Sequence, residues 1–97
     1  MQLRISPLAA EDLEAIGDFI AKDNPLRALS FIRELRAHCE KILRNPSAYR
    51  RRPELSEHLQ SCAHGNYLIF FECQLDSVNI VRILHGSRDI EPIIKPT

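Results

Sequence analysis

Residues 67–89 read YLIFFECQLDSVNIVRILHGSRD, and this stretch decides the fold. Two runs within it, residues 67–73 and 78–85, are rich in β-branched and aromatic residues, which favour extended strands. The link between them, residues 74–77, is short and largely polar. Two such runs joined by a short link predict a β-hairpin.

The second strand of this hairpin is apolar at neighbouring positions and not only at alternate ones. Strict alternation would place three side chains on one face of the sheet: Val78, Ile80 and Leu84. The other face would receive Val81 and Ile83. Both faces of the strand therefore need to be covered.

The residues before the hairpin predict one short strand and two helices. Residues 3–5 are apolar enough for a strand, and Ser6-Pro7 is a typical helix start. An apolar stripe at helical spacing follows, and Asn24-Pro25 ends this helix and begins a second. The second helix ends at Asn45-Pro46. Because the link between the helices is so short, we expect an antiparallel helical hairpin.

Residues 59–63 predict a further strand, which reaches the main hairpin through the turn signal Gly65-Asn66. The arginine run 50–52 is expected to be a loop. The order of elements, β-α-α-β-β-β, predicts an α+β fold with a small antiparallel sheet and the helical hairpin packed on one face. Two helices cover one face only, so the other needs the tail at 90–94, a second copy of the chain or a partner.

Composition limits the class of protein. The 97 residues form one small domain, residues 1–97, with 13 basic and 13 acidic residues and no net charge. This balance argues against direct nucleic-acid binding by the chain alone, since nucleic-acid binders normally carry a basic excess. No apolar run reaches the roughly 20 residues that cross a bilayer. Three cysteines without CxxC spacing are typical of reduced thiols, so we expect a cytoplasmic location and no membrane association.

A metal or cofactor site is not expected. Cys62 and His64 form the only close pair of candidate ligands, whereas zinc needs three or four that converge. Cys39 lies on the apolar stripe of the second helix and Cys73 ends a strand, where thiols are usually inert.

Three cationic or ionisable groups at the end of the hairpin allow two interpretations. His85 could act as a general base and Arg82 and Arg88 could stabilise phosphate charge, which together would support RNA cleavage by a 2′-hydroxyl. Alternatively, His85 and Arg82 form ordinary hydrogen bonds and an ion pair at a strand end. Because isolated His and Arg residues are not a motif, the second interpretation is favoured.

A pattern that covers nearly the whole chain ends in the stretch Ile83-Leu84-His85-Gly86-Ser87-Arg88-Asp89-Ile90. Its earlier parts are an opening strand, Asp12-Leu13-x-x-Ile16, Phe19-Ile20, Asn24-Pro25, Phe31, Leu35, Cys39, Pro46, Arg52-x-x-Leu55 and residues 65–71. This pattern resembles the ParE branch of the ParE/RelE toxin superfamily, and the closing stretch is its most specific part.

The resemblance implies the toxin half of a bacterial type II toxin–antitoxin module, held inactive by a cognate antitoxin that is ParD-like or another DNA-binding protein. ParE-type members poison DNA gyrase and are not enzymes. RelE-type members cleave mRNA on the ribosome, and His85 with Arg82 would be the catalytic candidates there. The chain lacks the lysine-rich middle and C-terminal tyrosine common in RelE-type members. A third alternative is a non-toxic module that only binds antitoxin.

On the ParE interpretation no residue is catalytic, and the chain is expected to form a hetero-oligomer with its antitoxin. The candidates for contact with the target gather on the hairpin: Tyr67, Arg82, His85, Arg88 and Asp89. The candidates for contact with the antitoxin lie on the two helices: Leu13, Ile16, Phe19, Ile20, Phe31 and Leu35.

Overall fold

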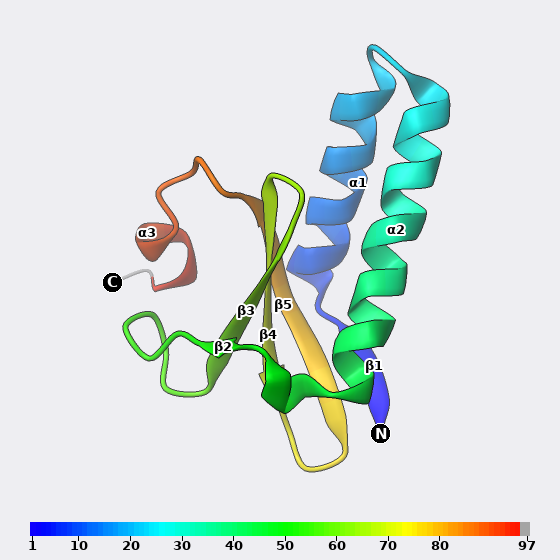
Figure 1. The fold of residues 1–97 in the computed structure, drawn as a ribbon. Coiled ribbons are helices and arrows are strands. Elements are labelled where there is room, and N and C mark those ends of the chain that lie inside the picture. The colour runs from blue at the N-terminus through cyan, green and yellow to red at the C-terminus, as the bar shows by residue number, and fades with distance from the viewer. Residues whose placement is uncertain (96–97) are drawn as a thin grey trace.

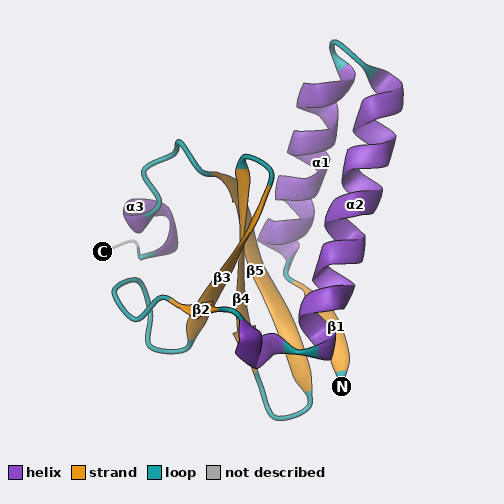
Figure 2. Cartoon of the chain, in the orientation of Figure 1, coloured by secondary structure: helices purple, strands orange, loops and turns teal. Residues whose placement is uncertain are grey.

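The computed structural model describes residues 1–95 and has the α+β architecture that the sequence predicts (Figures 1 and 2). The elements are, in chain order, β1 (Gln2–Ile5), α1 (Pro7–Ala21), α2 (Pro25–Arg44), the 3₁₀ helix η1 (Pro46–Ala48), β2 (Arg50–Arg51), β3 (Leu59–His64), β4 (Tyr67–Cys73), β5 (Ser77–His85) and α3 (Glu91–Ile94). The helices α1 and α2 lie side by side on one face of the sheet, and α3 lies on the opposite side (Figure 1).

The five strands form one sheet in the order β1-β5-β4-β3-β2. The pairs β5-β4, β4-β3 and β3-β2 are antiparallel, whereas β1 runs parallel to β5, with Gln2 opposite Ser77 and Ile5 opposite Ile80. The sheet is therefore mixed and not antiparallel throughout. Because α1 and α2 carry the chain across one face of the sheet after β1, this strand can run parallel to β5. The arginine run, expected as a loop, instead supplies the edge strand β2, in which Arg50 lies opposite Ser61.

The helix starts form as their sequence signals predict. The Ser6 hydroxyl oxygen accepts a hydrogen bond from the Ala9 amide at 3.0 Å and donates to the Val81 carbonyl at 2.8 Å. Asn24 caps α2 by accepting from the Arg27 amide at 3.1 Å. Each cap satisfies a backbone donor that the first helical turn leaves unpaired. The Ser6 hydroxyl also joins the start of α1 to β5.

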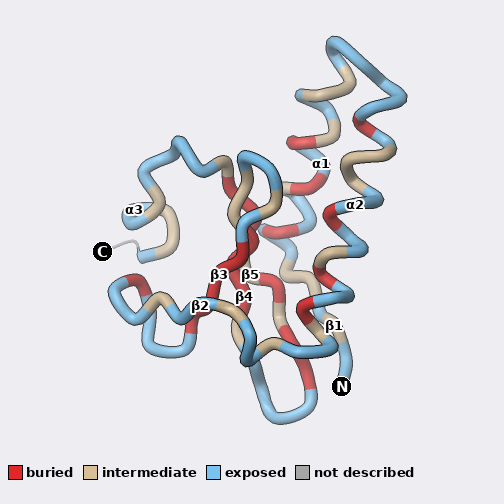
Figure 3. The backbone as a smooth tube through the Cα atoms, in the orientation of Figure 1, coloured by how far each residue is buried: buried red, intermediate tan, exposed pale blue. Residues whose placement is uncertain are grey.

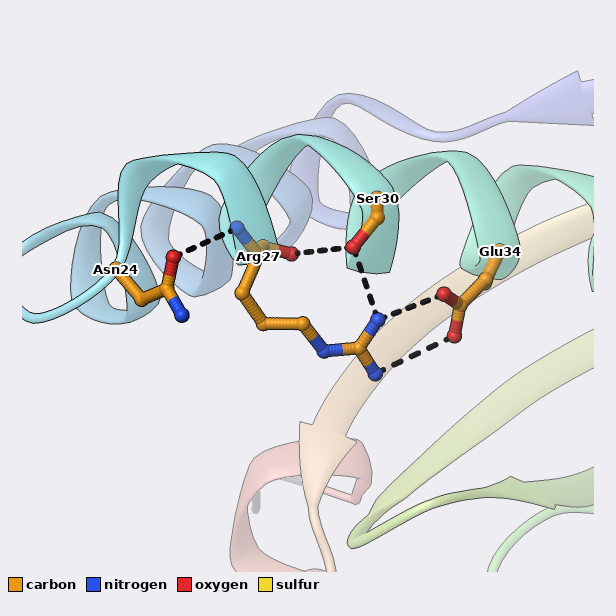
Figure 4. A network of polar contacts seen from close by, with 4 residues as sticks. All are labelled: Asn24, Arg27, Ser30 and Glu34. Carbon is orange, nitrogen blue, oxygen red and sulfur yellow. Dashed lines mark hydrogen bonds and ion pairs between the residues drawn. The ribbon is translucent and has the colours of Figure 1, made fainter.

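Arg27 is hydrogen-bonded to neighbouring side chains on the exposed side of the first turns of α2 (Figure 4). Its guanidinium donates to the Ser30 hydroxyl at 2.9 Å and to the Glu34 carboxylate at 2.7 Å. The same group lies 5.2 Å from the centre of the Phe31 ring, within cation–π range. This face of α2 is therefore a polar surface held by side chains of the helix itself.

Two apolar cores lie on the two faces of the sheet. Figure 3 shows buried residues along the strands β3, β4 and β5 and at intervals along α1 and α2. The larger one, between the sheet and α1 and α2, includes Leu13, Ile16, Leu35, Cys39, Ile42, Ile69, Phe71, Val78, Ile80 and Ile83. The smaller one contains Leu55, Leu59, Phe70 and Leu84, against which Leu68, Val81, Ile90, Ile93 and Ile94 pack. The tail thus covers the second face of the sheet, which is one of the three solutions that the sequence left open.

The assignment of faces by strict alternation along β5 is right for Val78, Ile80 and Val81 but wrong for Ile83 and Leu84. Phe70 lies opposite Arg82 and Phe71 opposite Ile80, so Val81 is an extra residue in a β-bulge. The bulge shifts the alternation by one position. Ile83 consequently joins Val78 and Ile80 in the larger core, and Leu84 joins Val81 on the other face.

Within residues 1–95, none of the helices combines the length and the apolar character that a membrane crossing requires.

Candidate functional site

Tyr67 and His85 form the centre of the candidate site, at the end of the β4–β5 hairpin. They lie opposite each other in register, and their rings meet edge to face with centroids 5.2 Å apart. Both residues line two clefts. One, of about 380 Å³, is bounded by the β3–β4 turn and the turn after β5; the other, of about 150 Å³, opens toward Phe19 on α1. The two rings therefore separate two hollows on one edge of the molecule.

The turn after β5 fixes the orientation of the His85 ring. The Ser87 amide donates to His85 Nδ1 at 3.1 Å, and the Ser87 hydroxyl lies 2.7 Å from the same nitrogen. Because a backbone amide can only donate, Nδ1 is the acceptor and the neutral ring carries its proton on Nε2. The Gly86 amide in turn donates to the Asn66 carbonyl at 2.7 Å, which ties this turn to the β3–β4 turn. His85 thus presents an N–H group from a fixed ring.

Arg82, predicted as a contact residue, is bound within the molecule. Asp12 on α1 accepts hydrogen bonds from Arg82 Nε at 2.8 Å and Nη2 at 2.9 Å, and from the Ile83 amide at 2.9 Å. The side chains of Arg82 and Asp12 are only 17% and 12% exposed. The hydrogen bond to Asp12 raises the pKa of Arg82 above its ordinary value, although burial opposes this. Arg82 and His85 thus make the ion pair and hydrogen bonds that the favoured interpretation predicted.

Arg88 and Asp89 lie in the turn that follows His85, and both are exposed. Arg88 also lines the cleft that opens toward Phe19, together with Tyr67 and His85. Of the five residues predicted to contact a target, the structure therefore brings Tyr67, His85 and Arg88 to one cleft. Asp89 follows directly in the chain, and Arg82 is the member engaged elsewhere.

The residues predicted to contact an antitoxin divide into two groups by burial. Leu13, Ile16 and Leu35 are core residues, with exposed fractions of 4%, 7% and 0%, so they are not available to a partner on this surface. Phe19 is 66% exposed, and Ile20 and Phe31 are partly exposed. The apolar stripe predicted helical packing correctly but does not separate core residues from surface residues.

Three exposed leucines on the helices were missed by the sequence reasoning: Leu8, Leu26 and Leu29. Leu29 borders a cleft of about 460 Å³ between α1 and α2, whose lining is mostly apolar and includes two charged residues, Arg33 and Arg36. The apolar lining residues are Gly17, Ala21, Pro25, Ala28, Leu29 and Ile32. The signal was present in the sequence, since Leu26 and Leu29 lie off the core stripe of α2.

Within the part of the chain that the structure describes, no group of three or more His, Cys, Asp or Glu side chains could hold a metal ion. Cys39 is a core residue, and burial raises the pKa of its thiol to about 11. Burial also raises the pKa of the Cys62 thiol. Such thiols are protonated at neutral pH and are poor nucleophiles and poor metal ligands.

The chain is similar to known proteins both in sequence pattern and in fold. A family model described as the ParE toxin of the type II toxin–antitoxin system, parDE, matches residues 3–90. No curated protein sequence matches the chain. A solved structure of the chromosomal ParDE toxin–antitoxin system from P. aeruginosa contains a chain similar in fold, with a TM-score of 0.78 at 20% sequence identity. The likeness covers 88% of this chain and 95% of that one, and at this identity it shows the fold alone.

Proposed function

The chain belongs to the ParE toxin family of type II toxin–antitoxin systems, and on this premise we propose that it inhibits DNA gyrase by direct contact and is neutralised by a cognate antitoxin. On this view the chain is a non-enzymatic inhibitor that acts in the cytoplasm. The observation that carries it is the surface formed by Tyr67, His85 and Arg88, which borders the larger core at Tyr67 and lines one cleft.

This surface is suited to contact with a protein. Tyr67 and His85 offer two rings whose mutual packing holds them in place, and Arg88 adds an exposed cation. Rigid aromatic groups and arginine are enriched among the residues that dominate protein interfaces. Asp89, next to Arg88, provides an exposed charge of opposite sign.

The state of Arg82 supports inhibition over RNA cleavage. A nuclease site built on His85 would need a cation free to meet the charge that develops on phosphate. The Arg82 guanidinium donates two hydrogen bonds to Asp12, so it would have to leave that carboxylate before it could serve. On the alternative, a ribosome-dependent endoribonuclease, His85 and Arg82 would be the catalytic residues.

The antitoxin is proposed to bind the helical hairpin. Phe19, Leu26 and Leu29 are large apolar side chains that lie exposed on α1 and α2. An amphipathic helix of a ParD-like antitoxin would place its apolar side in the cleft beside Leu29 and acidic side chains near Arg33 and Arg36. The edge strand β2 offers a second site, where an extended segment could add to the sheet.

A supercoiling assay with purified gyrase tests the proposed target. The wild-type protein should inhibit supercoiling, and Arg88→Ala and His85→Ala should weaken this inhibition by about tenfold or more, as loss of an interface anchor does. Arg44→Ala, an exposed arginine at the end of α2, is the matched control and should inhibit like the wild type. Gyrase that keeps full activity at a molar excess of toxin would refute the target.

A translation reaction tests the alternative. On the proposal, mRNA remains intact on ribosomes in the presence of the protein. Cleavage of mRNA that disappears in His85→Ala would instead establish the endoribonuclease. Normal growth on expression without antitoxin, with gyrase and mRNA both unaffected, would identify the chain as a non-toxic module that binds antitoxin.

A further inference from the structure

His38 lies at the centre of a chain of polar contacts between α2 and β3. Its Nδ1 is 2.8 Å from Nδ1 of His64, and its Nε2 is 3.1 Å from the sulfur of Cys62. All three side chains are at least partly buried. Both nitrogens of one imidazole are therefore engaged by groups on the neighbouring strand.

The short contact between the two Nδ1 atoms has room for one proton only. In the uncharged pair, one ring donates N–H and the other accepts through its lone pair. A pair with one added proton keeps this hydrogen bond, because the charged ring donates and the neutral ring accepts. A second added proton places N–H against N–H, with two positive charges at hydrogen-bond distance.

Other groups around His38 also oppose the uptake of a second proton by the pair. Partial burial is the largest cause that lowers the pKa of His38, followed by the charges of His64 and of Lys41, one turn along α2. From the segment after η1, the Tyr49 ring packs at 6.4 Å, and from β3 the Cys62 thiol contacts Nε2. None of these neighbours carries a negative charge that would favour a second proton.

Glu34 is the acidic group on α2 whose charge interacts with that of His64. Its carboxylate is engaged by Arg27, which donates to it at 2.7 Å (Figure 4). The carboxylate is exposed and already paired, so it gives little relief to a doubly charged histidine pair.

We propose that the His38–His64 pair is an acid-sensitive latch between α2 and β3, closed while at most one of the two imidazoles is charged and open when both are. This inference rests on the geometry of the pair and is independent of the proposed target and antitoxin.

The latch is connected to the surface by a row of aromatic contacts. The His64 ring packs against Phe31 at 5.4 Å, Phe31 against Tyr67 at 5.6 Å, and Tyr67 against His85 at 5.2 Å. Opening of the latch removes the support of His64 from Phe31, and through Phe31 it loosens the packing of Tyr67. Acid should therefore alter the environment of Tyr67 before the chain unfolds.

The direction of the pH dependence follows from counting protons. In the unfolded chain both histidines are protonated as the pH falls through about 6.5. In the folded pair, the contact between the two Nδ1 atoms leaves room for one of these two protons and opposes the second. The unfolded state then binds one more proton, so stability falls as the pH falls below about 6.5, and the unfolding constant rises by up to about tenfold per pH unit.

Urea unfolding of the full chain at pH 7.5 and pH 5.5 tests the latch. The unfolding constant of the wild type should rise by about tenfold between these values. His64→Gln can still hydrogen-bond His38 but removes the second ring, so the rise should be clearly smaller than in the wild type, with the burial of His38 as its remaining cause. His58→Gln, at an exposed histidine, is the matched control and should behave like the wild type. An equal rise in wild type and His64→Gln, or none in the wild type, would overturn the proposal.

Histidine NMR on the wild-type protein gives a second test that needs no variant. The signals of His38 and His64 should move together as the pH falls, because the two rings share one hydrogen bond. Near-ultraviolet circular dichroism should change over the same pH range, because Tyr67 packs in the aromatic row and Tyr49, the other tyrosine, packs against His38. Independent movement of the two signals, with no change in dichroism, would refute the latch.

Discussion

Asp12 and Arg82 lie 70 positions apart in the sequence and are joined by two hydrogen bonds of 2.8 and 2.9 Å. The same carboxylate also accepts from the Ile83 amide, just beyond the bulge in β5. β1 pairs with β5 only as far as Ile80, so Asp12 takes over where the strand partner ends. This carboxylate fixes α1 to the part of β5 that leads into the candidate site.

Asp12→Ala should destabilise the fold by about 2–3 kcal/mol, since it leaves a partly buried guanidinium and a backbone amide without their acceptor. Urea unfolding at pH 7.5 measures the change. Glu14→Ala, at an exposed position on the same helix, is the control and should change stability by less than about 0.5 kcal/mol. A loss below about 1 kcal/mol for Asp12→Ala would show that the contact contributes little.

Gly65→Ala should destabilise the protein by about 1–2 kcal/mol. Gly65 has φ of +58°, a left-handed conformation that costs L-residues about this much. The added Cβ would lie 3.8 Å from Phe31, an ordinary contact, so the cost arises from the backbone. Gly17→Ala in α1, where the Cβ would lie 3.5 Å from Ile32, should instead stabilise by about 0.5–1 kcal/mol. Thermal unfolding of both variants tests the contrast, and equal shifts in melting temperature would contradict it.

The double substitution Ile90→Ser with Ile93→Ser should expose the smaller core on the face of the sheet away from α1 and α2. Both isoleucines pack against the cluster that contains Phe70 and Leu84. We expect increased binding of the dye ANS and concentration-dependent self-association on size exclusion, because a freed apolar patch tends to associate. Glu91→Ser, which replaces an exposed residue of α3, serves as the control. If the double variant remains monomeric and binds no more dye, the tail is not needed to cover this face.

Leu29→Asp should weaken antitoxin binding at least about tenfold, because it places a charge at the border of an apolar cleft. The protein encoded by the adjacent reading frame is the partner to test, by titration calorimetry. Leu75→Asp, at a fully exposed leucine in the turn between β4 and β5, is the matched control. Both variants should unfold at nearly the wild-type urea concentration. Unchanged affinity of Leu29→Asp would place the antitoxin elsewhere.

Much of the fold could be predicted because its signals are local. Ser6-Pro7, Asn24-Pro25 and Gly65-Asn66 act through hydrogen bonds or backbone conformations within a few residues, and each ends or begins an element where expected. The bulge at Val81 could not be predicted, since an extra residue in β5 is defined only by its register with β4. One unrecognised bulge exchanged the faces of Ile83 and Leu84.

The candidate site was predicted in part for the same reason. Tyr67 and His85 were found because Tyr67 begins one strand of the hairpin and His85 ends the other. The partner of Arg82 was missed, because Asp12 lies on a distant helix and nothing in its neighbourhood marks it as a hydrogen-bond acceptor for β5. The His38–His64 contact was missed likewise, since it depends on how α2 sits against β3.

The pairing of β1 with β5 has a consequence for how the chain is made. Gln2 lies opposite Ser77, so the first strand has no partner until three quarters of the chain has been synthesised. During translation α1 and α2 can form, but their apolar sides lack the β5 residues that complete the larger core. Contacts between such distant segments form slowly. Folding is therefore completed only after synthesis is nearly over, and a chain that ends before β5 lacks both the partner of β1 and part of the larger core.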